Sequence, residues 1–332
     1  MTRLLMAGTG LIGHRHMAHI EAHPDLVLAG VIDPMPERRP EGVPGFGDIA
    51  DVDVAADGII IATPTPTHAP LTLAALERGW HVLVEKPVAE DLDAAQTMID
   101  AAKSANRQIL VGHHRRHHPR VAKLKELIAS ERLGTPVTAA LLWTMRKPDD
   151  YFDVPWRAGM DGAPVKQNLI HDVDTLRHLF GDVVYVTGFG SNAVRGANRT
   201  ESGAAVLGFA SGVSVTIAFA DTTPTPWGFE AGTGESPFIP KTGQDFLRIA
   251  CTRGAIEFPS LRTWSGAETW NELPKASETE IEDAVPLIRQ LEHFAEVIAG
   301  SATPLVSAED ARATLETTLR IEAATRPKGE IA

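Results

Sequence analysis

A glycine-rich motif near the start of the chain constrains its fold more than any other feature. The apolar run Leu4–Ala7 leads directly into Gly8-x-Gly10-x-x-Gly13, and a helical pattern follows. Gly8 permits the tight turn that leaves a strand, Gly10 lets the backbone approach a pyrophosphate, and Gly13 lets the helix pack closely on the strand. The first N–H groups of that helix then face the phosphates. A strand before the motif and a helix after it are the context that a dinucleotide-binding loop requires. We therefore expect these loop residues to bind such a cofactor: Gly8, Thr9, Gly10, Leu11, Ile12 and Gly13.

An acidic residue follows at the interval that such a loop predicts. Residues 27–32 are apolar enough for a second strand, and Asp33 ends it, about 20 residues after Gly13. A carboxylate at this position can bind the ribose hydroxyls and repels a phosphate on the 2′ oxygen. Asp33 therefore favours NAD over NADP. Arg38 and Arg39 lie close by in the sequence and are the groups that would accept that phosphate in the less favoured NADP alternative.

Strands and helices alternate up to residue 118. Expected strands cover 58–62, 81–84 and 108–112, whereas four prolines make residues 34–57 irregular. This alternation predicts a doubly wound parallel sheet. Open α/β sheets bind ligands beyond the carboxyl ends of their strands. The residues at these ends are therefore assigned to the cofactor site: Ala62, Thr63, Pro64, Thr67, His68, Glu85 and Lys86.

The pattern changes after residue 118. A loop is expected over 146–167 and a helix over 168–180, and the later segments have the β-branched content and turn flanks of an antiparallel sheet. We therefore divide the chain into a Rossmann domain, residues 1–118, and a second α/β domain, residues 119–332. A long loop at 221–243 contains Trp227 and Phe229, which we expect either at a subunit interface or over a substrate. The expected strands of the second domain are 183–190, 202–210, 212–220, 244–251 and 255–258.

Composition excludes several classes of partner. The chain has 332 residues, which suits two domains, and its net charge of −12 disfavours binding to nucleic acid or to an anionic membrane surface. No apolar run approaches the roughly 20 residues that a membrane span needs. Cys251 is the only cysteine, so no disulfide can form within the chain, as is usual in a reducing cytoplasm. We expect a cytoplasmic protein.

The segment His113–Pro119 contains four histidines and invites a metal-site interpretation. The pairs at 113 and 117 and at 114 and 118 have the spacing of neighbouring helical positions, but Pro119 follows at once and the spacing converges only on a helix. We therefore expect no metal here. The segment is expected to be a polar loop that places Arg116 near the substrate or the cofactor.

Taken together, the motifs resemble those of the Gfo/Idh/MocA family of nicotinamide-dependent oxidoreductases. The resemblance implies a Rossmann domain followed by an α/β domain with an open, mostly antiparallel sheet that binds substrate. It also implies a homodimer or homotetramer formed through the outer face of that sheet. The motifs that carry it span nearly the whole chain: Gly8-x-Gly10-x-x-Gly13 with His16, Asp33, Ala62-Thr63-Pro64 with His68, Glu85-Lys86-Pro87, Gly112 with Arg116, and Asn168-Leu169-Ile170-His171-Asp172-Val173-Asp174.

The same resemblance implies roles for three residues. Lys86 matches the family's lysine beside the nicotinamide and the reacting carbon, and His171 matches the histidine that exchanges a proton with the substrate hydroxyl. Asp174 matches the substrate-side carboxylate. A structural ion pair is the other interpretation of Asp174, and we expect Asp172 to face solvent or to cap the helix start.

The chain departs from the family pattern in two places. Three glycines of many members are replaced by Gly162-Ala163-Pro164, and Gln167 stands where many sugar and inositol enzymes have an aspartate four residues before the histidine. A neutral amide can orient an imidazole, but it does not stabilise an imidazolium as a carboxylate does. The proton relay and the substrate class are therefore left open.

The residue types themselves fit alcohol oxidation. Histidine has a pKa near working pH and can take the O–H proton as hydride leaves carbon, and a lysine beside the alcohol oxygen can hold and polarise it. We therefore assign catalysis to Lys86 and His171. Together with Lys86, His171 and Asp174, we assign to the substrate site Arg116, Trp156, Arg157 and Asn168.

The expected function is hydride transfer between NAD(P) and a secondary alcohol or ketone of a sugar, cyclitol or related polyol. Alternatives within the family are an NAD-dependent glycosidase that oxidises its substrate transiently and a dihydrodiol or hydroxy-acid dehydrogenase. Outside that chemistry, a further alternative is a cofactor sensor without turnover. A metal-dependent hydrolase or lyase would instead use one helix face, on which His171, Asp174 and His178 recur at i, i+3 and i+7.

Overall fold

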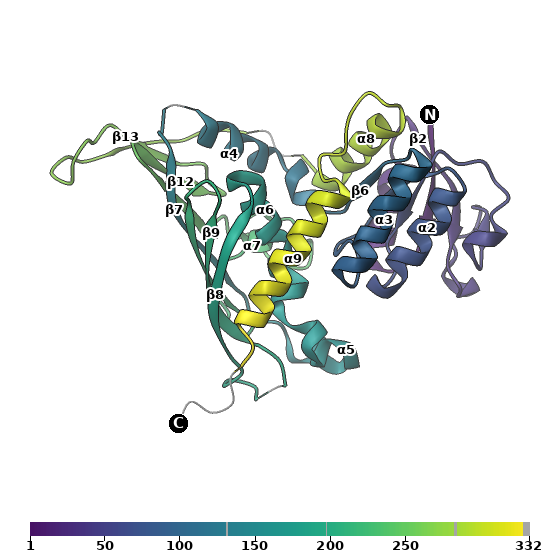
Figure 1. Cartoon of the computed structure of the whole chain (residues 1–332), viewed down its shortest axis with the longest axis horizontal. Coiled ribbons are helices and arrows are strands. Elements are labelled where there is room, and N and C mark those ends of the chain that lie inside the picture. The colour runs from purple at the N-terminus through teal and green to yellow at the C-terminus, as the bar shows by residue number, and fades with distance from the viewer. Residues whose placement is uncertain (131, 197, 282–283, 328–332) are drawn as a thin grey trace. The chain divides into compact units, whose positions relative to one another are not determined.

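The chain forms two compact units. The computed structural model describes residues 1–130, 132–196, 198–281 and 284–327. One unit consists of Met1–His118 with Ala284–Leu315, and the other consists of Pro119–Asp283 with Glu316–Ala332. The last residues of the expected second domain, 328–332, lie outside the described residues. Figure 1 labels the helices and strands.

The first unit contains a six-stranded sheet in which all strands are parallel, in the order β3-β2-β1-β4-β5-β6. The order reverses between β1 and β4, which creates the crevice where sheets of this kind bind nucleotides. The doubly wound sheet predicted from sequence is therefore confirmed. The strands are β1 (Thr2–Ala7), β2 (Leu26–Ile32), β3 (Gly45–Phe46), β4 (Gly58–Ile61), β5 (His81–Val84) and β6 (Ile109–Val111), and the helices are α1 (Leu11–Glu21), α2 (His68–Glu77), α3 (Leu92–Ala105) and α8 (Pro286–Ile298).

The central strands of this sheet are apolar because helices cover both faces. The side chains of Leu4, Leu5, Ile59, Ile60 and Leu83 are all fully buried. Residues 34–57 hold only short pieces, namely β3 and two single turns of 3₁₀ helix. The prolines in this segment account for its irregular backbone.

The second unit is built on an eight-stranded sheet in the order β14-β13-β12-β11-β7-β10-β9-β8. Only β7 and β10 run parallel, and every other neighbouring pair is antiparallel. The predicted mostly antiparallel sheet is confirmed. Its strands are β7 (Pro136–Thr144), β8 (Val183–Ser191), β9 (Ser202–Phe209), β10 (Ser214–Ala220), β11 (Leu247–Cys251), β12 (Gly254–Phe258), β13 (Thr263–Ser265) and β14 (Lys275–Ser277), and its helices are α4 (Pro119–Ala129), α5 (Pro155–Ala158), α6 (Ile170–Phe180) and α7 (Phe229–Thr233). Helix α9 (Ala308–Ala324) contributes to both units.

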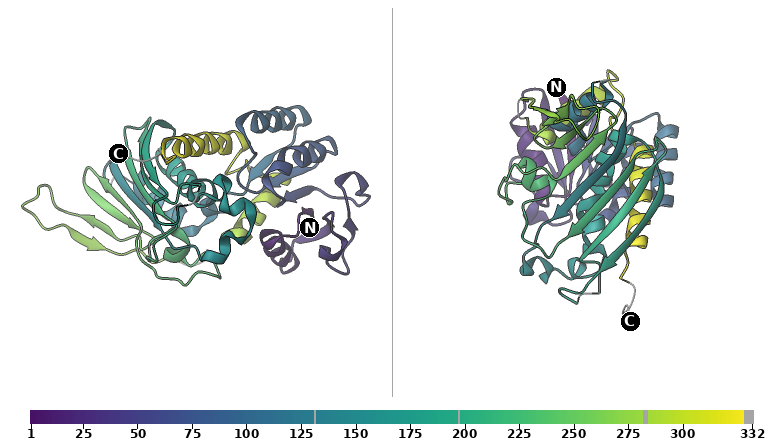
Figure 2. Two further views of the ribbon diagram at one scale, coloured as in Figure 1. Left: turned by 90° about the horizontal axis from the view of Figure 1, so that it is seen from below. Right: turned by 90° about the vertical axis from the view of Figure 1, so that its left-hand side faces the viewer.

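Among the described residues, helices cover only one face of this sheet. Val121 and Leu124 of α4 and Val173 and Leu176 of α6 pack with inward side chains of the strands in one core. The opposite face is seen in the right-hand view of Figure 2, where the strands run uncovered by any helix. An uncovered sheet face is a candidate interaction surface.

Several expectations for the second unit were wrong. Phe229 lies neither at a free surface nor over a cavity, because it is 1% exposed and packs in the core with the rings of Phe246 and Phe258. Asp172 does not face solvent, since it is 1% exposed. The expected loop over 146–167 contains α5 and short 3₁₀ turns, and a π-helical turn at Val165–Leu169 leads into α6.

No helix in the part of the chain that the structure describes has both the length and the apolar character to cross a membrane.

Candidate active site

The glycine loop between β1 and α1 has the shape of a phosphate cradle. Gly8 adopts a φ of 87°, which favours glycine, and a methyl group at Gly13 would overlap the carbonyl oxygen of Gly8. By contrast, nothing lies within 4 Å of a Cβ built on Gly10. No side chain caps the start of α1, and its first turn contains no acidic residue. The free N–H groups and the open space at Gly10 fit the pyrophosphate of a dinucleotide.

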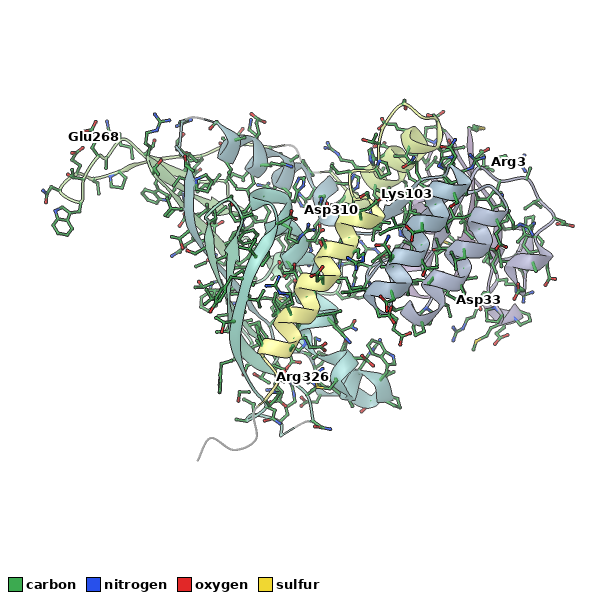
Figure 3. The ribbon with its side chains drawn as sticks, viewed as in Figure 1. Arg3, Asp33, Lys103, Glu268, Asp310 and Arg326 are labelled. Carbon is green, nitrogen blue, oxygen red and sulfur yellow. The ribbon has the colours of Figure 1, made fainter. Side chains whose placement is uncertain are left out.

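Asp33, at the end of β2, is held beside this loop. Its carboxylate accepts hydrogen bonds from the Thr9 hydroxyl at 2.6 Å, the Thr9 backbone N–H at 3.1 Å and the Met35 N–H at 2.9 Å. Burial alone would raise the pKa of Asp33, but these hydrogen bonds and the charge of Arg38 lower it below its ordinary value. The side chain, labelled in Figure 3, therefore keeps its negative charge.

The loops after β4 and β5 are joined by one buried imidazole. His68 lies with Nε2 2.9 Å from the Thr63 carbonyl oxygen and Nδ1 2.9 Å from the Pro87 carbonyl oxygen. Burial, which outweighs these hydrogen bonds, lowers the pKa of His68. The Thr67 hydroxyl donates to Pro64 at 2.7 Å and lies 2.6 Å from the Thr63 hydroxyl, which fixes the turn between β4 and α2. His68 thus sets the spacing of the two loops that were assigned to the cofactor site.

Glu85 and Lys86 follow β5 directly. The Glu85 carboxylate lies 2.9 Å from Nε2 of the fully buried His16 in α1, and it fits there because Gly112 has no side chain. Burial would raise the pKa of Glu85, but the hydrogen bond with His16 and the positive charges of His16, His114 and Lys86 hold it at about 2. Lys86 itself is half-buried at the carboxyl end of β5, on the same sheet edge as the glycine loop.

The histidine-rich segment is more enclosed than its composition indicates. His113, Arg115, Arg116, His117 and His118 are all buried. The Arg116 guanidinium forms an ion pair with Asp310, whose position Figure 3 shows on α9. This pairing fixes the segment, and a contact of Arg116 with substrate stays a prediction.

The second unit carries the other predicted site residues. On α6, His171 is 7% exposed and Asp174 is fully buried. Asn168 lies in the π-helical turn just before α6, and its Oδ1 is buried without a hydrogen-bond partner among the described residues. π-helical turns often occur at functional sites. Trp156 is 48% exposed. The Arg157 guanidinium stacks on two rings, with its carbon 5.4 Å from the centre of the Trp156 ring and 4.5 Å from the centre of the Tyr151 ring.

Metal binding finds no support among the described residues, because no three histidine, cysteine or acidic side chains lie together as metal ligands would. The helix-face set of His171, Asp174 and His178 does not form such a group. His178 lies instead with Nδ1 3.3 Å from the Lys125 ammonium.

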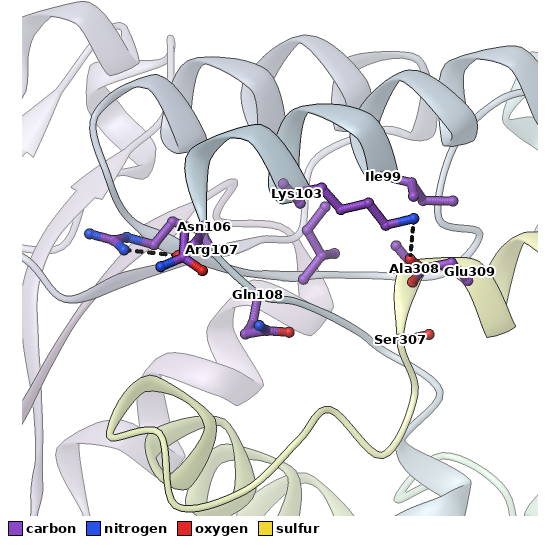
Figure 4. Close-up of a pocket in the computed structure, with 10 residues that line it drawn as sticks. Ile99, Lys103, Asn106, Arg107, Gln108, Ser307, Ala308 and Glu309 are labelled. Atoms are coloured by element: carbon purple, nitrogen blue, oxygen red, sulfur yellow. Dashed lines mark hydrogen bonds and ion pairs between the residues drawn. The ribbon is translucent and has the colours of Figure 1, made fainter.

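A pocket of about 360 Å³ lies elsewhere in the first unit, between the end of α3 and the start of α9 (Figure 4). Lys103 pairs there with Glu309 at 3.1 Å. Gln108 and Ile109 line it at the amino-terminal start of β6, so the pocket lies at the sheet edge opposite the glycine loop. It is therefore separate from the candidate site.

Comparison with known proteins gives the family. A family model described as the oxidoreductase family with an NAD-binding Rossmann fold matches residues 2–113, and a model of the GFO/IDH/MocA C-terminal domain matches residues 121–257. The chain belongs to the Gfo/Idh/MocA oxidoreductase family. The resemblance inferred from the sequence motifs is thereby confirmed.

Two curated proteins are similar to this chain in sequence, and one solved structure is similar to it in fold. The chain is 32% identical to an inositol 2-dehydrogenase from Mycolicibacterium smegmatis over 55% of this chain and 54% of that protein. It is 29% identical to a 1,5-anhydro-D-fructose reductase from Ensifer adhaerens over 85% of this chain and 81% of that protein. The crystal structure of an oxidoreductase from Agrobacterium radiobacter, in complex with NAD⁺, L-tartaric acid and magnesium, has the same fold. It has a TM-score of 0.82 and 17% identity, and the match covers 97% of this chain and 96% of that one. The match to the inositol 2-dehydrogenase spans about half the length of that relative.

Some features of this Gfo/Idh/MocA chain could not be found from its sequence. The contact between His16 and Glu85 joins residues 69 positions apart. Tyr151, whose ring lies against both Lys147 and Arg157, has no sequence signal, because isolated lysines and tyrosines carry no spacing pattern. His16 is one of the residues that carry the family resemblance, and this is the only sequence signal for the pair of His16 and Glu85.

Proposed function

We propose that the protein is a dehydrogenase that transfers a hydride between a nicotinamide dinucleotide and a secondary alcohol or ketone of a sugar, cyclitol or related polyol. The observation that carries the proposal is the placement of Lys86 at the carboxyl end of β5, on the sheet edge that holds the glycine loop and Asp33. Open α/β sheets bind ligands in the crevice beyond the carboxyl ends of their strands. The names of the two curated relatives, an inositol dehydrogenase and an anhydrofructose reductase, support a polyol substrate.

In this proposal a bound nicotinamide would supply the hydride acceptor or donor, and the residues of the chain handle the proton. Lys86 holds and polarises the alcohol oxygen, and its ammonium stabilises negative charge that develops there. His171 takes the hydroxyl proton through its imidazole during oxidation and returns it during reduction. Residues 1–118 serve as the cofactor-binding domain and residues 119–332 as the substrate domain, where Trp156, Arg157, Asn168 and Asp174 contact the substrate.

NAD is the proposed cofactor rather than NADP. The ionised Asp33 carboxylate beside the glycine loop repels a 2′-phosphate. Arg38 and Arg39 are the alternative ligands for that phosphate. Arg39 donates a hydrogen bond through Nε to the Asp33 backbone oxygen at 2.8 Å. That contact occupies part of its guanidinium and holds it against the backbone, which supports NAD.

Two further parts of the proposal concern assembly and location. We propose a cytoplasmic location, because the chain has a single cysteine and an acidic composition. We also propose a homodimer or homotetramer that uses the uncovered face of the eight-stranded sheet. No nucleic acid or membrane partner is part of the proposal.

The first test is NADH formation by the purified protein with NAD and a panel of free sugars, inositols, sugar acids and cyclic diols, repeated with NADP. We expect a substrate-dependent signal with NAD. Lys86→Met and His171→Ala are each expected to lower kcat by at least 100-fold, because general acid–base catalysis contributes about 10²–10⁴-fold. Both variants should still bind NAD, which a shift in melting temperature reports.

The outcomes separate the alternatives. Full activity of both variants would remove the assigned roles. If no compound in the panel yields NADH while NAD still raises the melting temperature, a glycosidase with transient oxidation or a cofactor sensor replaces the dehydrogenase.

A further inference from the structure

The loop that follows β7 places two positive charges on one aromatic ring. The Lys147 ammonium lies 4.8 Å from the centre of the Tyr151 ring, and the Arg157 guanidinium lies 4.5 Å from the same centre. Lys147 is 9% exposed and Tyr151 is half-buried. Both cations thus lie beside one ring in a partly buried setting, and an anion bound beside that ring would be attracted to both of them.

The ring of Phe152, the next residue, also lies against two cations, but the protein itself neutralises their charge. The guanidinium groups of Arg195 and Arg199 lie 4.9 and 4.3 Å from the Phe152 ring. Both also donate to the fully buried Asp221 carboxylate, at 2.7 and 2.6 Å. These two arginines are therefore held by an acid of the protein and anchor the turn that contains Phe152.

Arg157 has no such acid. Among the described residues its guanidinium contacts only the Tyr151 and Trp156 rings, and its Nε is buried without a hydrogen-bond partner. Stacking on aromatic rings orients a guanidinium but leaves its in-plane N–H donors unused. Arg146, in the same loop, differs because it pairs with Asp149 at 3.1 Å. Arg157 is thus an oriented cation with donors left for a ligand.

The backbone on both sides of this cluster is tied to the fold and leads to the predicted substrate residues. Lys147 continues β7 beside the end of β10, where its N–H donates to the Asp221 carbonyl oxygen at 3.0 Å. Residue 162 is a glycine packed against the Arg157 backbone, since a methyl group there would overlap the Arg157 carbonyl. That contact ties Arg157 to the segment that continues into the π-helical turn with Asn168 and on to His171.

We propose that the substrate carries an anionic group, a carboxylate or a phosphate, which binds the Arg157 guanidinium while Lys147 supplies the second positive charge. The inference rests on the proposed dehydrogenase function and narrows its substrate from polyols in general to sugar acids or sugar phosphates. The planar fork of arginine matches the paired oxygens of either group. The Tyr151 and Trp156 rings hold that fork in place before the ligand arrives.

Binding of defined probes to the NAD-loaded protein tests this directly. Calorimetric titrations would compare D-gluconate, D-glucuronate and D-glucose 6-phosphate with the neutral D-glucose and myo-inositol. We expect at least one anionic probe to bind more than tenfold more tightly than the neutral compounds. Arg157→Gln should weaken that probe by about 10- to 100-fold, the range expected for loss of a charge-assisted hydrogen bond, so that the preference for the anionic probe over the neutral compounds is lost.

Two variants keep the test interpretable. Arg157→Lys retains the charge but loses the planar fork. Its affinity for the anionic probe should therefore lie between those of the wild type and Arg157→Gln. Arg146→Gln removes a charge from the same loop at an exposed, acid-paired position, and it should bind every probe as the wild type does. Unchanged thermal unfolding would show that the variants fold.

The outcomes are distinct from those that test the dehydrogenase itself. A preference for carboxylates over the phosphate, or the reverse, identifies the anionic group. The inference is overturned if no anionic probe binds more tightly than the neutral compounds, or if the preference survives in Arg157→Gln. A neutral polyol that is oxidised without any such preference would leave the dehydrogenase standing and remove only the anionic substrate. Absence of NADH formation with every compound would instead remove the dehydrogenase.

Discussion

At the scale of single residues, Glu85 links charge at the candidate site to the stability of the first unit. It is buried against His16, and its pKa is about 2 rather than the ordinary 4.5. Because the pKa in the folded state lies below the ordinary value, the ionised carboxylate stabilises the fold fully above pH 4.5. This contribution is lost as the pH falls from 4.5 toward 2.

Replacing this carboxylate should therefore change both stability and its dependence on pH. We expect Glu85→Gln to lower the free energy of unfolding at pH 7 by about 3 kcal/mol, since each pKa unit corresponds to about 1.4 kcal/mol. The loss of stability between pH 4.5 and 2 should become shallower than in the wild type. Urea denaturation across this range measures both effects, with the exposed Glu90→Gln as the matched control. Parallel pH profiles for the wild type and Glu85→Gln would show that the pair with His16 adds nothing.

At the scale of elements, Gly10 and Gly13 of the glycine motif have different roles. Gly13 lies where a methyl group would meet the Gly8 carbonyl oxygen, so Gly13→Ala should push α1 away from β1. Overpacking of this kind typically costs about 1–3 kcal/mol. Gly10 has an ordinary φ of −70° and open space around it, so Gly10→Ala should leave stability unchanged.

The two variants should both lose affinity for NAD, but for different reasons. In Gly13→Ala the helix N-terminus is displaced, whereas in Gly10→Ala the added methyl group occupies space that the pyrophosphate needs. Melting temperatures and NAD titrations of both proteins check this. If Gly10→Ala bound NAD as tightly as the wild type, the open space at Gly10 would have no role in cofactor binding.

Elements with a strong periodic or spacing signal could be predicted from sequence, and those set by tertiary packing could not. The glycine loop, the parallel strands and Asp33 follow from local rules that relate glycine position and apolar runs to a known backbone. The π-helical turn at Val165–Leu169 has no such sequence signal, and neither do the three-residue strands β13 and β14. Phe229 was misjudged because its neighbours are glycine and proline, yet it packs in a core formed by strands far away in sequence. Asp172 is buried although its charge alone indicates exposure.

At the scale of the whole molecule, the uncovered face of the eight-stranded sheet has the composition of an interface. Cross-strand partners share a face, and the pairing registers place Tyr185, Phe189, Val206 and Leu142 among its side chains together with many alanines and threonines. Among the described strand positions on this face, the only charged residues are Arg248 and Glu257, which pair with each other at 3.3 Å. Sheet faces that remain in water usually carry polar and charged side chains, so this face is expected to be covered.

A single charge placed in the middle of this face should test the proposed assembly. Val206 lies on the central part of β9 and is 40% exposed in the single chain. We expect Val206→Asp to weaken self-association by at least 100-fold, because burying an unpaired carboxylate in an interface costs about 3 kcal/mol or more. Light scattering with size-exclusion chromatography over a range of concentrations measures the mass. Phe238→Asp changes an equally apolar residue that is 72% exposed outside the strands, and it should leave the mass unchanged. A wild-type protein that is monomeric at every concentration, or a Val206→Asp protein that assembles as the wild type does, would place the interface elsewhere or remove it.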